Sequence, residues 1–169
     1  VLAAEGERAF AVHASSSGFD MAAFQAHNLW VAHMAADIVA DRGARDDAFL
    51  AGLLHDIGHL VLAARVPRSF EQIQCACVAE RQDRSAAERS VLRVDHGHIG
   101  AYLLGVWGLP VQLVTAVADH HTPREGGLAL DGALTIGMSV AISEELAAAV
   151  FPFNIEMDGT PQYQDDSRW

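Results

Sequence analysis

The sequence predicts an all-α fold, a compact multi-helix bundle in a single domain. Apolar residues recur at the three- and four-residue spacing of helices, and no segment reads as a ladder of strands. Of the 169 residues, 51% are hydrophobic and 20% are charged, which is typical of a globular domain large enough to bury its own core.

The first predicted helix follows a lead segment over residues 1–19 that ends in small and polar residues. Asp20 has the short carboxylate side chain of an N-cap, and apolar residues then recur over about 21–42. Gly43 closes this helix.

The next helix is expected to be central. Asp46 and Asp47 begin it, and it runs to about residue 64 with apolar residues on all sides, as in a helix surrounded by others. Pro67 suits the first turn of a shorter helix that ends near residue 80.

The second half of the chain contains three further predicted helices. They cover about 85–104, then from Leu109-Pro110 to His120-His121, then about 130–150, with Leu134, Ile136, Val140, Ile142 and Leu146 as the core stripe of the last. An irregular tail over 151–169 follows, so the helical domain is expected over 20–150.

Composition excludes several classes of function. The net charge is −11, all 11 basic residues are arginines, and they form no run, so binding to a nucleic acid polymer is not expected. The apolar stretches are too short to cross a bilayer, and no secretion signal opens the chain. We expect a cytoplasmic protein with no membrane association; its oligomeric state is left open.

His55 and Asp56 lie inside the most apolar segment, residues 51–58. Burying an imidazole next to a carboxylate is costly unless both groups have partners. A hydrogen-bonded core pair and a metal site explain these two residues equally well on their own.

Other histidines favour the metal site. His27, His96 and the pair His120-His121 fall on three other predicted helices, and a helical bundle can direct side chains from facing helices to one interior point. Imidazole and carboxylate ligands together suit divalent transition metals, so the expected cofactor is one or two ions of Fe, Mn, Zn or Ni.

Three phrases in order carry a family resemblance. They are His27-Asn28-Leu29-Trp30-Val31-Ala32, then Leu53-Leu54-His55-Asp56-Ile57-Gly58, then His120-His121-Thr122-Pro123 after Trp107-Gly108-Leu109-Pro110. Over about residues 20–147 the chain resembles the HDOD (HD-related output domain) family of the HD phosphohydrolase superfamily. The resemblance implies an HD-domain-like bundle, the HD-bearing half of a bacterial signal-transduction output module.

Carried over to this sequence, the resemblance makes His27, His55 and Asp56 ligands of one metal ion. Asp56 would bridge to a second ion held by His96, His120 and His121. Two positions depart from the family pattern. The best match to the aspartate expected on the last long helix is Ser139, and the lysine that often follows the HD-x-G phrase is His59.

These departures rank the possible functions. Loss of a carboxylate at Ser139 should weaken metal retention, so the first expectation is a signalling output domain that keeps its His/Asp metal site. The alternative is a metal-dependent phosphohydrolase or phosphodiesterase that acts on a nucleotide or cyclic nucleotide through two metal ions. In that case Asp56 and His59 are the catalytic candidates, with His59 supporting a ligand or contacting substrate. The expected partners are signalling proteins or a small phosphorylated ligand.

Overall fold

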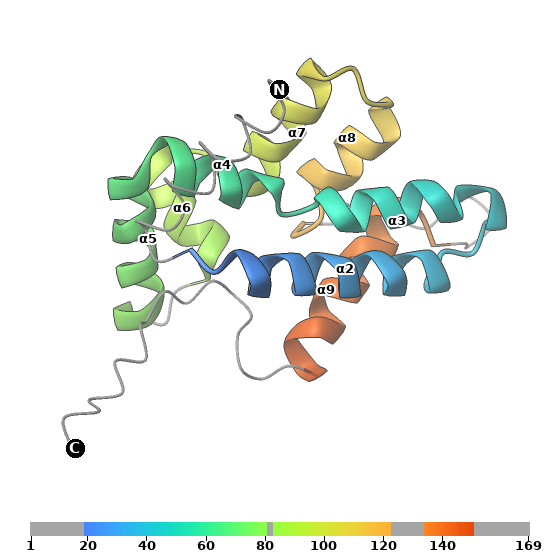
Figure 1. The fold of residues 1–169 in the computed structure, drawn as a ribbon, viewed down its shortest axis with the longest axis horizontal. Helices are drawn as coiled ribbons and strands as arrows, with labels where there is room; N and C mark the ends of the chain where they lie inside the picture. Colours follow the sequence, from blue (N-terminus) through green and yellow to red (C-terminus); the bar gives the residue numbers. More distant parts are fainter. Residues whose placement is uncertain (1–18, 81–82, 123–133, 151–169) are drawn as a thin grey trace.

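The computed structural model describes residues 19–80, 83–122 and 134–150, and every regular element in these ranges is a helix. The elements are α2 (Met21–Ile38), the 3-10 helix η1 (Arg42–Ala44), α3 (Arg45–Leu54), α4 (Ile57–Arg65), α5 (Pro67–Glu80), α6 (Arg84–Leu92), α7 (His96–Val106), α8 (Val111–Ala118) and α9 (Ile136–Val150). The all-α bundle is confirmed (Figure 1). Most of the expected lead segment and all of the expected tail lie outside the described residues.

Helix α2 lies alongside α3 and is crossed by α9 (Figure 1). Their shared core contains Val31 and Ala35 of α2, Ala48 of α3, Leu113 of α8 and Val140 of α9. A second apolar cluster, around Phe19, Phe24, Leu62 and Phe70, joins the start of α2 to α4 and α5. A third contains Ala101, Leu104 and Val117 and joins α7 to α8. Each of these seven helices, α2 to α5 and α7 to α9, therefore buries apolar residues against at least one other helix.

Two glycines allow the closest helix approaches. A Cβ atom at Gly52 of α3 would lie 2.7 Å from the Cα of Ala32 in α2, and one at Gly58 of α4 would lie 2.0 Å from the carbonyl oxygen of His96. Both distances are too short for a side chain, so only glycine allows these backbones to come together. The two close approaches lie on either side of His55-Asp56.

The central helix expected over 46–64 is two helices, α3 and α4, and this prediction was wrong in its continuity. The break falls at His55 and Asp56. The Nδ1 atom of His55 lies 2.7 Å from the carbonyl oxygen of Gly52, which a continuing helix would offer to the backbone N–H of Asp56. The His55 side chain thus competes with the backbone N–H of Asp56 for this carbonyl oxygen. The next helix, α4, begins at Ile57.

The single helix expected over 85–104 is also two, α6 and α7. Arg93 ends α6 in a left-handed conformation with φ of 66°. Asp95 then caps α7, accepting a hydrogen bond from the backbone N–H of His98. This second start places His96 at the first position of a helix.

Other helix ends follow the local signals more closely. Asp20 accepts from the N–H groups of Ala22 and Ala23 at 2.9 and 3.0 Å, which confirms it as the N-cap of α2. However, α2 ends at Ile38, four residues before the predicted end. In α9 the predicted core stripe is partly wrong, because Leu146 is 39% exposed while Ser139, Ser143 and Ala147 are buried.

Residues 42–65 meet a length and hydropathy criterion for a membrane-spanning helix, contrary to the expectation from the sequence. The signal is weak. Within this segment, 56% of the most apolar stretch is buried inside the protein. The helix is also interrupted between α3 and α4. The core helix of a soluble protein satisfies the same criterion.

Candidate metal centre

Side chains from six helices and their ends meet at one interior point. They are His27 from α2, His55 and Asp56 from the α3–α4 break, His59 from α4, Glu88 from α6, His96 from α7, His120 and His121 from the end of α8, and Glu144 from α9. All six residues predicted as metal ligands are therefore close together. Glu88 and Glu144 join them.

The first group surrounds one oxygen of Asp56. Its Oδ2 atom is 3.7 Å from Nε2 of His27 and 3.4 Å from Nε2 of His55. Glu144 approaches the same two rings from α9, with its Oε2 atom 2.9 Å from Nε2 of His27 and 3.2 Å from Nε2 of His55. Two carboxylates and two imidazoles thus converge.

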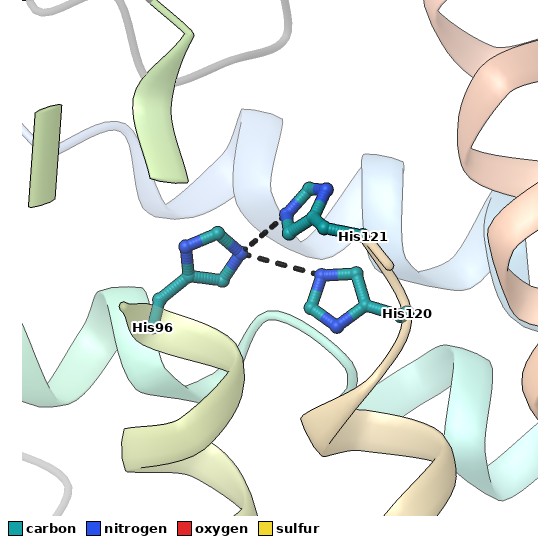
Figure 2. Close-up of side chains that lie close together, drawn as sticks. All are labelled: His96, His120 and His121. Carbon is teal, nitrogen blue, oxygen red and sulfur yellow. Dashed lines mark hydrogen bonds between the residues drawn. The ribbon is translucent and has the colours of Figure 1, made fainter. Parts of the chain in front are cut away.

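The second group surrounds the other oxygen of Asp56. Nε2 of His96 is 3.3 Å from Nε2 of His120 and 2.8 Å from Nε2 of His121 (Figure 2). The Oδ1 atom of Asp56 lies 3.3 Å from Nε2 of His96 and 3.8 Å from Nε2 of His120. The two oxygens of Asp56 therefore face different groups, as a bridging carboxylate requires.

The outward nitrogens of three rings have fixed partners. Nδ1 of His55 lies 2.7 Å from the carbonyl oxygen of Gly52, and Nδ1 of His120 lies 2.7 Å from that of Val117. Nδ1 of His96 lies 2.7 Å from Oε2 of Glu88. Because these oxygens only accept, each Nδ1 carries the proton, and in a neutral ring the lone pair is left on the inward-facing Nε2.

This donor set fits a metal ion. Nε2 of His55 and Oε2 of Glu144 are buried without a hydrogen-bond partner in the described part of the chain. In the second group, three Nε2 atoms lie close together, and His96 can hydrogen-bond to His120 or His121 only where one ring of the pair carries a proton on Nε2. Three sets of side chains bring candidate ligand atoms within 4.8 Å of one another: His27/His55/Asp56, His96/His120/His121 and Asp56/His59/His96. A cation among them would satisfy these buried lone pairs.

Without a bound cation, the carboxylates hold protons on two of the rings. Burial lowers the pKa of His55, but Asp56 and Glu144 outweigh it and raise that pKa to about 9. Burial likewise opposes the charge on His96, and Glu88 and Asp56 raise its pKa to about 10. These rings would have to release their protons to bind a metal through Nε2.

Two other rings are kept neutral. Burial and the nearby His96 lower the pKa of His59 to about 4, against the smaller effects of Asp56 and Glu88. Burial also lowers the pKa of His120, helped by His121 and His55. A neutral ring offers a metal its lone pair directly.

Helix α9 supplies the cluster with a carboxylate that the match of Ser139 to the family's aspartate did not indicate. Ser139 is fully buried, and its hydroxyl has no hydrogen-bond partner in the described residues. The carboxylate that reaches the cluster is Glu144, five residues further along the helix. A signal for it was present, since Glu144 and Glu145 are the only acidic residues of α9.

Two further residues, His59 and Glu88, lie inside the cluster, and two other histidines lie outside it. His59, the predicted catalytic residue, is 3% exposed, and its Nε2 atom lies 3.6 Å from Oδ1 of Asp56. Glu88 is fully buried beside His96 and His59. His33 and His98 are exposed and outside the cluster.

An all-helical bundle with a histidine and carboxylate cluster at a helix break defines the class of the protein, a helical domain of the HD type. The HDOD domain family model matches residues 1–123 of the 169, so the chain belongs to the HDOD family. The match confirms the family predicted from the sequence. It begins at residue 1, whereas we had placed the start of the resemblance at about residue 20.

Solved structures show the same fold. A protein from Shewanella amazonensis SB2B described as a "putative phosphohydrolase" has a TM-score of 0.68 and 27% identity, over 80% of this chain and 49% of that one. A "putative signal transduction protein" from Marinobacter aquaeolei VT8 has a TM-score of 0.63 and 26% identity, over 75% of this chain and 28% of that one.

An HDOD domain protein of unknown function from Geobacter sulfurreducens also matches, with a TM-score of 0.64 and 22% identity, and it shows the fold alone. The match covers 75% of this chain and 42% of the Geobacter protein. This chain thus spans about half or less of these three proteins. No curated protein matches it.

Proposed function

We propose that this HDOD domain binds two divalent transition-metal ions and hydrolyses a phosphoester in a small phosphorylated ligand as part of signal transduction. Glu144 is the observation that carries the proposal. It restores the carboxylate whose apparent loss at Ser139 had placed hydrolysis second, and it faces His27 and His55 within 3.2 Å.

The residues divide into two proposed ligand sets that share Asp56. His27, His55 and Glu144 hold one ion, and His96, His120 and His121 hold the other. A bound pair of such ions supplies Lewis-acid charge to the oxygens of a phosphoryl group. The protein contributes fixed ring orientations, because Gly52, Val117 and Glu88 hold the outer nitrogens of three imidazoles.

The exposure of the ligands suggests the side from which a substrate approaches. His55 and His96 are almost completely buried, whereas His121 is exposed and the side chains of His27 and Glu144 are 12% and 20% exposed. The cluster is therefore closed behind His55 and His96. It is open to solvent beside His121, Glu144 and His27.

A second candidate function is a metal-binding signalling module without turnover. His59 favours it, because this position replaces a lysine of the family pattern and its low pKa keeps the ring uncharged at neutral pH. Such a site would lack the positively charged lysine side chain that could attract a phosphate.

A hydrolysis panel distinguishes the two functions. Protein loaded with Mn²⁺ or Fe²⁺ is incubated with nucleotides, cyclic nucleotides and a generic aryl phosphate, with Asp56→Asn as the control. We expect hydrolysis of at least one compound and its loss in the variant by about a hundredfold or more. Metal binding without hydrolysis of any compound would favour the non-catalytic module.

A further inference from the structure

Glu88 is a fully buried carboxylate that faces two histidines of the cluster. Its Oε2 atom accepts hydrogen bonds from the backbone nitrogen and Nδ1 of His96, both at 2.7 Å. Its Oε1 atom lies 3.3 Å from Nδ1 of His59. One carboxylate thus lies beside the outer nitrogens of two rings. It is hydrogen-bonded to His96, whereas Nδ1 of His59 and Oε1 of Glu88 lie close together without a hydrogen bond in the described residues.

The rings of His59 and His96 are stacked, with centroids 3.8 Å apart and planes inclined by 22°. Because Glu88 contacts both Nδ1 atoms, both Nε2 atoms point the opposite way. They lie 3.6 Å and 3.3 Å from the same oxygen, Oδ1 of Asp56. His59 therefore presents its Nε2 atom to the shared carboxylate in the same way as His96.

With a proton on Nδ1, the neutral ring of His59 turns the lone pair of Nε2 toward the carboxylate oxygen of Asp56, and the two repel each other. A cation between them removes this conflict, and Asp56, His59 and His96 bring one ligand atom each within 4.8 Å of one another. Histidine at this position gives the site a metal-binding nitrogen, whereas a lysine would give it a positive charge.

We propose that His59 is a further metal ligand, and that Glu88 is the positioning residue that directs both His59 and His96 toward the ion shared with Asp56. The ligand is a divalent first-row transition ion, since imidazole nitrogens predominate in this half of the cluster. This inference rests on the proposed metal centre and adds His59 to it.

The wild-type protein provides the first test. Protein labelled with ¹⁵N-histidine is loaded with ¹¹³Cd²⁺, and scalar coupling through the metal–nitrogen bond identifies the coordinating rings. We expect coupling at Nε2 of His59 and a protonated Nδ1. Coupling at His96 and His120 but not at His59 would overturn this inference and leave the metal centre intact. Absence of coupling at every histidine would overturn both.

Variants test the two roles separately. His59→Phe keeps a ring that can stack on His96 but removes both nitrogens, and Glu88→Gln keeps the shape of the carboxylate. His33→Phe is the control, because His33 is an exposed histidine of α2 outside the cluster. We expect Co²⁺ affinity to fall at least about tenfold in the first two variants and to stay unchanged in the control.

The visible absorption of bound Co²⁺ separates loss of a ligand from a general loss of structure. In His59→Phe the d–d spectrum should change, since the nitrogen donor set changes. In Glu88→Gln the Nδ1 atoms of His59 and His96 lose the carboxylate charge beside them. The ¹⁵N chemical shifts of both rings should therefore change. A folded His59→Phe protein with wild-type Co²⁺ affinity and spectrum would contradict the proposal. If either variant does not fold, the ¹¹³Cd²⁺ experiment on the wild-type protein decides.

Discussion

At the scale of single residues, carboxylates determine what this cluster of histidines can do. Asp56 divides its two oxygens between two groups of rings, and Glu144 adds a second carboxylate to one of them. Burial makes such charges costly unless a cation or proton lies beside them. We therefore expect the cluster to hold protons without a metal and to release them if a metal ion binds.

The role of Glu144 is tested by Glu144→Gln, which keeps the size of the side chain and removes its charge. We expect metal affinity to fall at least about tenfold, measured by titration with Zn²⁺ or Mn²⁺. Glu145→Gln is the matched control, because Glu145 is the next residue of α9 and is exposed. Equal affinity in both variants would remove Glu144 from the ligand set.

Proton release on metal binding is a second expected outcome. The pKa values of about 9 for His55 and about 10 for His96 mean that both rings are protonated at pH 7 in metal-free protein. Asp56 and Glu144 face the first ring, and Glu88 and Asp56 face the second. Because a metal at Nε2 displaces these protons, affinity should rise as pH rises from 6 toward 9.

Calorimetry measures this release directly. The apparent binding enthalpy of Zn²⁺ at pH 7 should vary linearly with the ionisation enthalpy of the buffer, with a slope of about two protons per chain. An enthalpy that is the same in every buffer would contradict the assigned protonation of the two rings.

At the scale of elements, short helices and close backbone contacts hold the ligands in place. His55 and Asp56 lie where α3 gives way to α4, and His96 lies at the start of α7. The contact between α4 and α7 depends on Gly58, whose missing side chain makes room for the carbonyl of His96. The position of His96 thus depends on Gly58, which follows His55 and Asp56 closely in the sequence.

Gly58→Ala tests this dependence. The added methyl group would meet the carbonyl oxygen of His96 at 2.0 Å, so the two helices must separate. We expect a loss of about 1–3 kcal/mol in the free energy of unfolding, measured with urea, together with weaker metal binding. Gly105→Ala is the control, because nothing lies within 4 Å of a Cβ there, and in α7 alanine should stabilise by about 0.4–1 kcal/mol. Equal stability of the two variants would contradict the account of the α4–α7 contact.

At the scale of the whole molecule, the candidate ligands come from helices far apart in the sequence, from α2 to α9. Two ions held by these ligands would connect the helices and would stabilise only the folded chain. This linkage makes the stability of the domain depend on metal concentration.

Chelation measures the linkage. At a free metal concentration a thousandfold above the dissociation constant, binding adds about 4 kcal/mol to the free energy of unfolding. Treatment with 1,10-phenanthroline should therefore lower the melting temperature, and added Zn²⁺ should restore it. An unchanged melting temperature would show that the cluster contributes to the fold without a metal.

The sequence predicted the helices where local signals decide them and failed where tertiary contacts do. Asp20 and Pro67 marked helix starts correctly, because capping and proline geometry act within a few residues. The apolar pattern continues across His55 and Asp56, so periodicity could not reveal the break. Arg93 ends α6 with a positive φ that glycine usually adopts, and no sequence rule indicated it.

The candidate site shows the same division. The predicted histidines and Asp56 do converge in the structure. They could be recognised from the sequence because each lies in a short family motif. Glu144 was missed because the helical pattern of α9 did not indicate which of its turns faces His27 and His55. The burial of Glu88 could not be predicted, because nothing in the sequence shows that this residue of α6 reaches the ring of His96.

The metal content of the wild-type chain tests the central claim most directly. Protein purified without chelators is analysed for Fe, Mn, Zn and Ni, next to Asp56→Asn protein prepared in parallel. We predict about two ions per wild-type chain and a clear loss of metal in the variant. A folded wild-type protein that contains none of these metals, and takes up none when they are added, would contradict it.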